Sequence, residues 1–229
     1  MIDDPPLLKV RRHFRRPDPA VVQLLRDTPT GFVVDCMNGR GALDYRIKAV
    51  DDSAAQFVGT AVTCHAGPGD NLAIFAALEL AGPGDVIVAA TDQFTATSVA
   101  GDLLLGMVRN KGGVGFVTDG LVRDLVGIEQ VGLPAFSMGI TPNSPARNGP
   151  GTAGLPIHLG GVGVDAGDVV IADRDGVVVV PQRQLVAVCQ HLPKVRGAEA
   201  YLDRQVKNGL DHMAAVRQLM ASDRIEHID

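Results

Sequence analysis

The stretch FVGTAVTCHAGPGDNLAIFAALELAGPGDVIVAA, residues 57–90, decides the fold of this 229-residue chain. Residues 57–64 are rich in β-branched side chains and predict a strand. In the Gly-Pro-Gly-Asp that follows at 67–70, Pro in second place and Gly in third are typical of a tight turn, and Asp70 is placed to cap a helix over 71–81. The same four residues recur at 82–85 and lead into a second apolar strand, 86–90. The stretch therefore predicts an α/β unit.

Downstream of residue 90 the alternation of helix and strand continues. The predicted elements are a helix over 99–111, a strand over 114–118, a helix over 123–130 and a strand over 133–138. The predicted strands are short and apolar at consecutive positions, which is typical of strands buried on both faces of a largely parallel sheet. We therefore expect an α/β fold built around such a sheet.

The segments before residue 57 and after residue 138 do not follow this alternation of helix and strand. We expect helices over 18–27, where Asp18 is the cap and Pro19 the first position, and over 30–37. Residues 139–154 (GITPNSPARNGPGTAG) predict a loop long enough to suggest a functional or subunit-contact role. The later segments are predicted as a β-meander over 155–181, with turns at 165–168 and 173–176, and as helices over 182–206 and 211–222, the first bent at Pro193. No segment has the composition of a linker that would divide the chain. We therefore predict a single domain, 1–229, with an N-terminal arm, 1–16, and a helical C-terminal extension, 182–229.

Composition and charge exclude several function classes. The chain is 46% hydrophobic and carries a net charge of −5, so it can bury a core and is not drawn to a phosphate backbone. Aromatic residues make up only 4% of the chain and Trp is absent, which argues against a stacking platform for nucleic acid. A basic cluster stands out in the arm: Lys9, Arg11, Arg12, His13, Arg15 and Arg16. We interpret it as a solvated arm or a subunit contact rather than an RNA contact.

Cysteine usage and hydropathy bear on location. Cys36, Cys64 and Cys189 are far apart and form no CxxC, so neither a disulfide framework nor a thiolate zinc site is indicated. The first residues lack the basic start and apolar run of a signal peptide, and no apolar run is long enough to span a bilayer. We expect a soluble, cytoplasmic protein with no membrane partner and no nucleic-acid partner.

The first segment that could carry chemistry is Gly101-Asp102-Leu103-Leu104, at the expected opening turn of an apolar helix. The first turn of a helix presents unpaired N–H groups and a positive dipole end, so it favours a carboxylate or phosphate. Gly101 lets a ligand approach the backbone closely. Alone the motif is weak, because many helices begin with Gly-Asp for plain capping.

The second segment is DGLVRD at 119–124, directly after the strand that ends at Thr118. Ligands in open α/β sheets bind beyond the carboxyl ends of the strands, where this loop is expected. Arg123 offers a planar fork suited to a substrate carboxylate. Asp124 offers a hard oxygen to Mg²⁺ or Mn²⁺. The alternative is an Asp-Gly turn followed by a capped helix that carries a surface ion pair.

Both segments belong to a longer series of motifs spread over residues 20–210. In order these are AVT at 61–63, PGDNL at 68–72, PGDV at 83–86, GDLL at 101–104, DGLVRD at 119–124, GITPN at 139–143, NGPG at 148–151 and GDVVIADRDGV at 167–177. In this order and spacing they resemble the RraA-like family. That family includes 4-hydroxy-4-methyl-2-oxoglutarate/4-carboxy-4-hydroxy-2-oxoadipate aldolases, which also decarboxylate oxaloacetate, and the regulator of ribonuclease E activity.

The resemblance implies an RraA-like swivelling α/β/β/α sandwich with C-terminal helices, assembled as trimers or hexamers with active sites between subunits. It places a pyruvyl carboxylate on the backbone of Gly101 to Leu104, chiefly the amides of Leu103 and Leu104, and on Arg123. It places a divalent cation, Mg²⁺ or Mn²⁺, on Asp124. Asp102 resembles the acid that holds water near that cation, and Glu199 the C-terminal acid that reaches a neighbouring subunit's site.

The resemblance has gaps and leaves alternatives open. Many relatives carry an aromatic residue where this chain has Ala100, and an Asp where it has Ala90, which puts substrate identity in doubt. The favoured function is a metal-dependent lyase that cleaves a C–C bond of a small 2-oxo acid. In this mechanism the metal ion and the backbone amides at the helix start stabilise the negative charge of the enolate. The alternatives are a non-catalytic protein-binding regulator and a sibling lyase acting on another 2-oxo acid.

Overall fold

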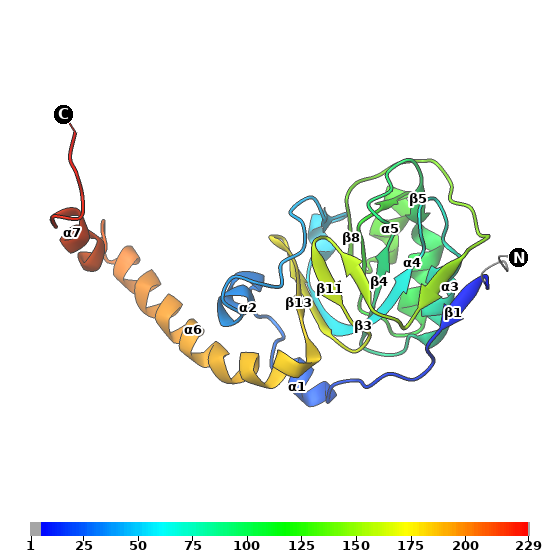
Figure 1. Ribbon diagram of the computed structural model, residues 1–229, viewed down its shortest axis with the longest axis horizontal. Coiled ribbons are helices and arrows are strands. Elements are labelled where there is room, and N and C mark those ends of the chain that lie inside the picture. Colours follow the sequence, from blue (N-terminus) through cyan, green and yellow to red (C-terminus); the bar gives the residue numbers. More distant parts are fainter. Residues whose placement is uncertain (1–5, 229) are drawn as a thin grey trace, which may run out of the picture.

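A mixed sheet lies at the centre of the molecule, and the structure, a computed structural model, describes residues 6–228 around it (Figure 1). The strand order is β1-β9-β3-β4-β6-β8-β2, and β12 pairs with β3 and with β13. The central strands run parallel: β3 Phe57–His65, β4 Asp85–Ala90, β6 Gly115–Thr118 and β8 Ala135–Ser137. These are the strands that the apolar runs predict, to within a few residues at each end.

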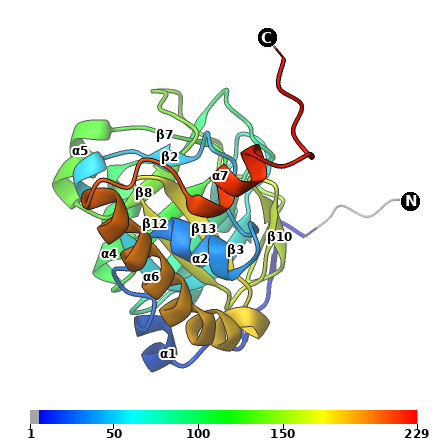
Figure 2. The same ribbon diagram turned by 90° about the vertical axis from the view of Figure 1, so that its left-hand side faces the viewer.

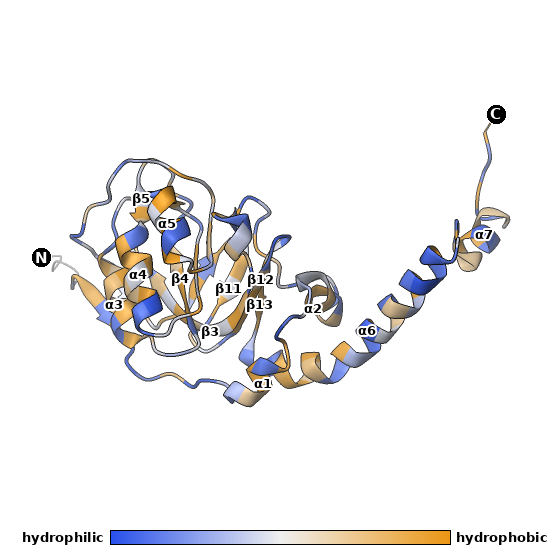
Figure 3. Ribbon diagram, turned by 180° about the vertical axis from the view of Figure 1, so that it is seen from behind, coloured by the Kyte–Doolittle hydropathy of each residue, from blue (hydrophilic) through white to orange (hydrophobic). Residues whose placement is uncertain are grey.

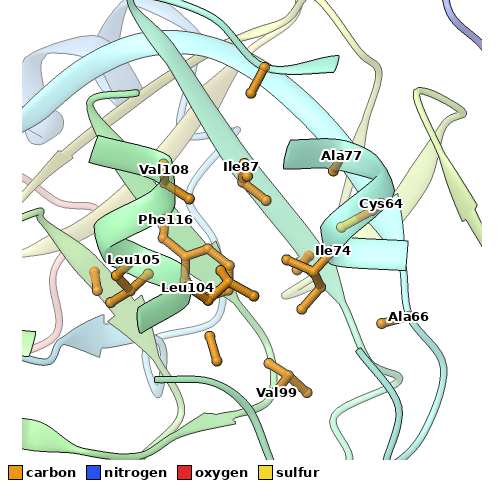
Figure 4. Close-up of a cluster of buried hydrophobic side chains, with 14 of the residues drawn as sticks. Cys64, Ala66, Ile74, Ala77, Ile87, Val99, Leu104, Leu105, Val108 and Phe116 are labelled. Carbon is orange, nitrogen blue, oxygen red and sulfur yellow. The ribbon is translucent and has the colours of Figure 1, made fainter. Parts of the chain in front are cut away.

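One face of this sheet is covered by helices that connect its strands. They are α3 Leu72–Leu80, α4 Asp102–Asn110 and α5 Leu125–Val131. Ile74 of α3 and Leu105 and Val108 of α4 pack with Ile87 and Phe116 of the sheet, and all are buried (Figure 4). On β4, Ile87 and Ala89 face these helices, whereas Val86 and Val88 face the opposite core. The consecutive apolar residues of the strand are explained by this burial on both faces.

The opposite face is covered by a second β layer. Its hairpins are β10 Ile157–Leu159 with β11 Val162–Val164, and β12 Val169–Asp173 with β13 Gly176–Val180. Val170 and Val179 pack toward the central sheet, whereas Ile171 and Val178 belong to a separate core on the outer side. Because side chains alternate along a strand, the second hairpin can bury both faces.

Helices cover the outer side of the β12–β13 hairpin, where Figure 2 shows α2 and α6 lying across it. They are α1 Pro19–Gln23, α2 Thr30–Cys36 and α6 Leu185–Lys207. The layers are therefore helix, sheet, sheet and helix, as the predicted fold class requires. The hydropathy colouring agrees, because the strands are mainly apolar while α6 alternates between apolar and polar residues (Figure 3).

The remaining short elements lie at the edges of these layers. They are β1 Leu8–Val10, β2 Lys48–Ala49, the 3-10 turn Asp52–Ala54, β5 Ser98–Ala100, β7 Leu121–Val122, β9 Gly151–Ala153, the 3-10 turn Gln182–Gln184 and α7 Ala214–Met220. No helix in the described part of the chain has both the length and the apolar character needed to cross a membrane.

Several predicted boundaries are wrong. Val99 and Ala100 lie in β5 rather than in the helix expected over 99–111, because the extended backbone of Gly101 (φ −145°, ψ −172°) separates them from α4. The first helix ends at Gln23 instead of 27. The segment 155–181 is not one meander, because its two hairpins join different sheets. By contrast, the helix expected over 182–206 continues through Pro193, as α6 does from Leu185 to Lys207.

The N-terminal arm is attached to the body of its own chain. Residues 1–5 of the expected arm lie outside the described residues, as does residue 229. Within the described part, β1 pairs with β9 in parallel, and Arg16 forms an ion pair with Asp85 at 2.8 Å. Leu8 and Phe14 pack against the helix-side core, which explains why this basic segment does not extend freely into solvent.

Candidate functional site

The two segments singled out in the sequence meet because β5 pairs with β7. Ser98 lies beside Leu121 and Ala100 beside Val122, and the Arg123 amide donates to the Ala100 carbonyl at 3.0 Å. Strand β5 leads directly into the first motif, and β7 lies inside the second, just before Arg123. The start of α4 and the Arg123–Asp124 pair are thereby placed side by side.

A cavity of about 410 Å³ opens at this junction. Its lining residues come from α3, β5, α4, the end of β7 and the loop after β8: Asn71, Phe75, Ser98, Val99, Ala100, Gly101, Asp102, Leu103, Leu104, Met107, Arg123, Asp124, Ser144, Pro145 and Arg147. This volume is within the range of small-molecule sites. All the predicted site residues except Glu199 line this one cavity.

Gly101 makes room for the Asp124 carboxylate. A Cβ atom at position 101 would lie 2.5 Å from Asp124 Oδ2 and 3.2 Å from Arg123 Cγ, so a side chain there would displace one or both. Asp124 itself has a left-handed backbone (φ 63°, ψ 47°), which is uncommon for a residue other than glycine. This conformation, which Asp adopts more readily than most other residues, turns the chain at the start of α5.

Arg123 is held at two atoms. Its Nε lies 3.2 Å from Asp124 Oδ2, and its Nη1 donates to Ser144 Oγ at 2.6 Å. The side chains of Arg123 and Asp124 are 37% and 45% exposed, so water screens their attraction and the pair adds little stability. Both groups are therefore oriented and yet open to a ligand.

Asp102 occupies part of the position expected for the substrate. Its Oδ1 accepts a hydrogen bond from the Leu103 amide at 2.7 Å, and its side chain fills the space beside Gly127 of α5. A substrate carboxylate on the Leu103 amide would have to replace this bond. The Leu103 side chain is 76% exposed at the edge of the cavity.

Glu199 is not brought to this cavity within one chain. It lies exposed on α6, which leaves the body of the molecule on the side away from α4 and α5 (Figure 1). Its expected contribution would therefore have to be made to another copy of the chain.

Sequence reasoning missed the residues that line the other side of the cavity. Phe75 and Asn71 come from the start of α3, and Ser144 and Arg147 come from the loop after β8. Two signals were available, because Asn71 belongs to the PGDNL motif and the loop 139–154 is unusually long. Neither signal showed that Arg147 lies in this cavity.

Asp119, the first residue of the second motif, serves the scaffold. It is buried and accepts hydrogen bonds from the Thr91 amide at 2.6 Å, the Thr91 hydroxyl at 3.0 Å and the Gln93 amide at 3.2 Å. Burial raises the pKa of its carboxyl, although these hydrogen bonds act in the opposite direction. Asp119 thus joins the segment after β4 to the end of β6.

The donors in the cavity suit a hard divalent cation. Residues 6–228 contain no group of three His, Cys, Asp or Glu side chains arranged to hold a metal, which disfavours a closed zinc-type site. Mg²⁺ and Mn²⁺ accept one or two carboxylates and fill their remaining positions with water or substrate oxygens. Asp124 offers such a carboxylate, and its side chain is 45% exposed at the cavity.

The cavity combines two carboxylates with two arginines, and guanidinium groups of this kind are suited to bind the carboxylate of a small organic acid. Residues 30–179 match the family described as RraA-like, Aldolase/RraA. The chain therefore belongs to the RraA-like family. A relative from Halalkalibacterium halodurans, named "Putative 4-hydroxy-4-methyl-2-oxoglutarate aldolase", is 35% identical over 192 residues, covering 84% of this chain and 90% of that one.

Solved structures of similar fold include family members described as ribonuclease inhibitors. RraAS2 of Streptomyces coelicolor, described as an unusual member of the RNase ES inhibitor RraA protein family, superposes with a TM-score of 0.75 at 28% identity, covering 83% of this chain and 100% of that one. The RNA-processing inhibitor RraA from Thermus thermophilis has a TM-score of 0.62 at 28% identity, covering 68% of this chain and 93% of that one. The family match and the relative named as a putative aldolase support a lyase-like role at the level of the family.

Proposed function

We propose that this protein is a divalent-metal-dependent aldolase that cleaves a C–C bond of a 4-hydroxy-2-oxo acid to release pyruvate, and that it also decarboxylates oxaloacetate. The observation that carries the proposal is the meeting of Gly101, Arg123 and Asp124 in one cavity through the β5–β7 pair. The name of the Halalkalibacterium halodurans relative supports the choice of substrate class.

Each side chain has a separate task in this proposal. Asp124 would hold Mg²⁺ or Mn²⁺, which supplies Lewis-acid stabilisation of an enolate when it is bound. Arg123 and the amides at the start of α4, once the substrate replaces the bond between the Leu103 amide and Asp102, orient the substrate carboxylate and place positive charge near the developing negative charge. Asp102, with Glu199 of a neighbouring copy, holds the water that accepts the proton of the C4 hydroxyl.

The proposal includes a homotrimer or homohexamer with its sites between subunits. From Pro193 to Ile228, none of the described residues is buried, although exposed apolar side chains such as Tyr201, Val206 and Met213 lie along this segment. A helix without tertiary contacts is only marginally stable in water. A second copy covering this segment would stabilise it and bring Glu199 near a cavity.

The free cysteines support the proposed cytoplasmic location.

A pyruvate-release assay tests the proposed function. Full-length protein is incubated with oxaloacetate or 4-hydroxy-4-methyl-2-oxoglutarate, in Mg²⁺, in Mn²⁺ and after chelation, with protein-free controls for spontaneous decarboxylation. We expect release that the chelator abolishes and added metal restores. Arg123→Ala should lower kcat/KM by about 100- to 1000-fold, through both substrate capture and turnover. Release that ignores the chelator, or unchanged kinetics of Arg123→Ala, would contradict the proposed mechanism.

A second candidate function is a protein-binding regulator without catalysis. The descriptions of the Streptomyces coelicolor and Thermus thermophilis structures as ribonuclease or RNA-processing inhibitors favour it. Against it, the cavity brings Asp102, Arg123 and Asp124 together, an arrangement that a regulator does not need. Failure to release pyruvate from any tested 2-oxo acid would favour the regulator. Release from another 2-oxo acid alone would indicate a sibling lyase.

A further inference from the structure

Arg147 is a second guanidinium in the cavity, and its backbone is fixed by hydrogen bonds to the segment before α3. The Ala146 amide donates to the Gly69 carbonyl at 2.7 Å, and the Asn71 amide donates to the Ala146 carbonyl at 3.0 Å. Asp70 Oδ2 accepts from the Gly149 amide at 3.1 Å and also from the Asn148 amide. The loop is therefore held on both sides of residue 147.

The side chain of Arg147 is held by two further contacts. Its Nε donates to Asn71 Oδ1 at 3.2 Å, and its Cζ lies 4.2 Å from the centre of the Phe75 ring. Asn71 is buried and donates through Nδ2 to the Val99 carbonyl at 3.2 Å, which fixes the amide. A guanidinium above an aromatic ring is stabilised by the negative face of that ring. Arg147 is thus oriented before any ligand binds.

The two arginines of the cavity differ in how many of their hydrogen-bond donors are free for a ligand. Arg123 is paired with Asp124 and with Ser144. Within residues 6–228, Arg147 has no carboxylate in ion-pair range, and no hydrogen bond of its Nη1 or Nη2 is formed. These two nitrogens can form the fork that binds a carboxylate with two parallel hydrogen bonds.

We propose that Arg147, supported by Asn71 and Phe75, binds the second carboxylate of a dicarboxylic 2-oxo acid, the end opposite to that held by Arg123. This inference rests on the proposed function, because it concerns the far end of the same substrate. Arg147 then acts as a specificity residue that selects 4-hydroxy-2-oxo diacids over monoacids of equal length. When the bond between C3 and C4 breaks, Arg147 holds the fragment that carries the second carboxylate, while Arg123 holds the pyruvyl fragment.

The test measures binding of two five-carbon 2-oxo acids that lack the C4 hydroxyl. Calorimetry in Mg²⁺ gives the Kd of 2-oxoglutarate and of 2-oxopentanoate, which lacks only the second carboxylate, for the full-length protein and for Arg147→Gln. The unmodified protein should bind the diacid roughly 10- to 100-fold more tightly than the monoacid. Arg147→Gln should lose this preference and keep its affinity for the monoacid, which also shows that the variant is folded.

Arg174→Gln serves as the matched control, because Arg174 is 75% exposed in the β12–β13 turn, outside this cavity, and should keep the preference. A preference that persists in Arg147→Gln overturns the inference, and so does an equal loss of affinity for both acids. Pyruvate release by the unmodified protein is measured separately. A preference that depends on Arg147, without pyruvate release, would leave the subsite standing and refute the proposed aldolase.

Discussion

Gly101 controls the distance between the backbone before α4 and the Arg123–Asp124 pair. Its extended backbone is one that any residue can adopt, so the requirement for glycine comes from space and not from φ. A methyl group at this position would lie 2.5 Å from Asp124 Oδ2. The carboxylate, which is half-exposed, would have to turn away from the cavity.

We therefore predict that Gly101→Ala lowers kcat/KM for pyruvate release by about 100-fold, because a displacement of about 1 Å is enough to disturb a catalytic arrangement. The free energy of unfolding should fall by no more than about 1–3 kcal/mol. Steady-state kinetics and urea unfolding measure the two effects. Gly31→Ala is the control, because a Cβ at position 31 in α2 meets nothing within 4 Å. Normal activity in Gly101→Ala would show that Asp124 does not act from its observed position.

At the scale of elements, the sequence predicts the central sheet and the two motifs better than it predicts how they meet. Strands β3, β4, β6 and β8 are apolar runs bounded by turn residues, and they are found where expected. The β5–β7 pair was missed because β5 has three residues and β7 has two, too short for any periodicity. That pair nevertheless sets the geometry of the cavity.

Arg147 was missed for a related reason. It lies in a loop without periodic pattern, and its place depends on hydrogen bonds to residues 69–71, which are far away in sequence. Arg123 and Asp124 could be predicted at the cavity because the DGLVRD motif that contains them directly follows a predicted strand, at the end where ligands bind in α/β proteins. Local patterns therefore identify the side of the site that follows a strand, but not the side formed by a loop.

Asp119 connects the ends of β4 and β6, and we predict that its contribution to the stability of the fold depends on pH. Burial raises the pKa of Asp119 in the folded protein above its value in the unfolded chain. The protonated carboxyl therefore stabilises the fold below the unfolded-state pKa, and this contribution is lost as pH rises through the folded-state pKa. Asp119→Asn should lower the free energy of unfolding by about 1–3 kcal/mol in acid. The hydroxyl oxygen of the protonated carboxyl can still accept a hydrogen bond, whereas the NH2 group of Asn can only donate.

The deficit of Asp119→Asn should become smaller as the pH rises toward neutral, since only the native residue acquires a buried charge. Urea unfolding of both proteins at a series of pH values measures this difference. Asp52→Asn is the control, because the Asp52 side chain is 74% exposed and its replacement should have little effect at any pH. A deficit that grows with pH would show that Asp119 is stabilised in its charged form.

For the whole molecule, the C-terminal segment has too few contacts of its own. Within residues 6–228, the first half of α6 packs on the body through the buried Leu185, Val188 and Leu192 and through a hydrogen bond from Arg196 to the Thr28 hydroxyl. Farther along, α6 and α7 line an apolar groove of about 330 Å³ that includes Leu202, Val206, Leu210, Met213 and Val216. Exposed apolar surface of this kind marks an interaction site. In the proposed oligomer a second copy covers this surface, and its Glu199 would complete the cavity.

Mixing of two inactive variants tests whether Glu199 acts on a neighbouring copy. Arg123→Ala and Glu199→Gln should each be nearly inactive as separate proteins. If the site combines Arg123 of one copy with Glu199 of another, random mixed oligomers contain roughly one intact site in four, and co-expression should restore activity to that extent.

The double variant Arg123→Ala/Glu199→Gln, co-expressed with Arg123→Ala, is the control and should stay inactive, because no intact Arg123 is present. Absence of restored activity in oligomers that demonstrably contain both single variants would place Glu199 outside the neighbour's site. A site built within one copy would keep a defect in either single variant, so restored activity requires Arg123 of one copy and Glu199 of another.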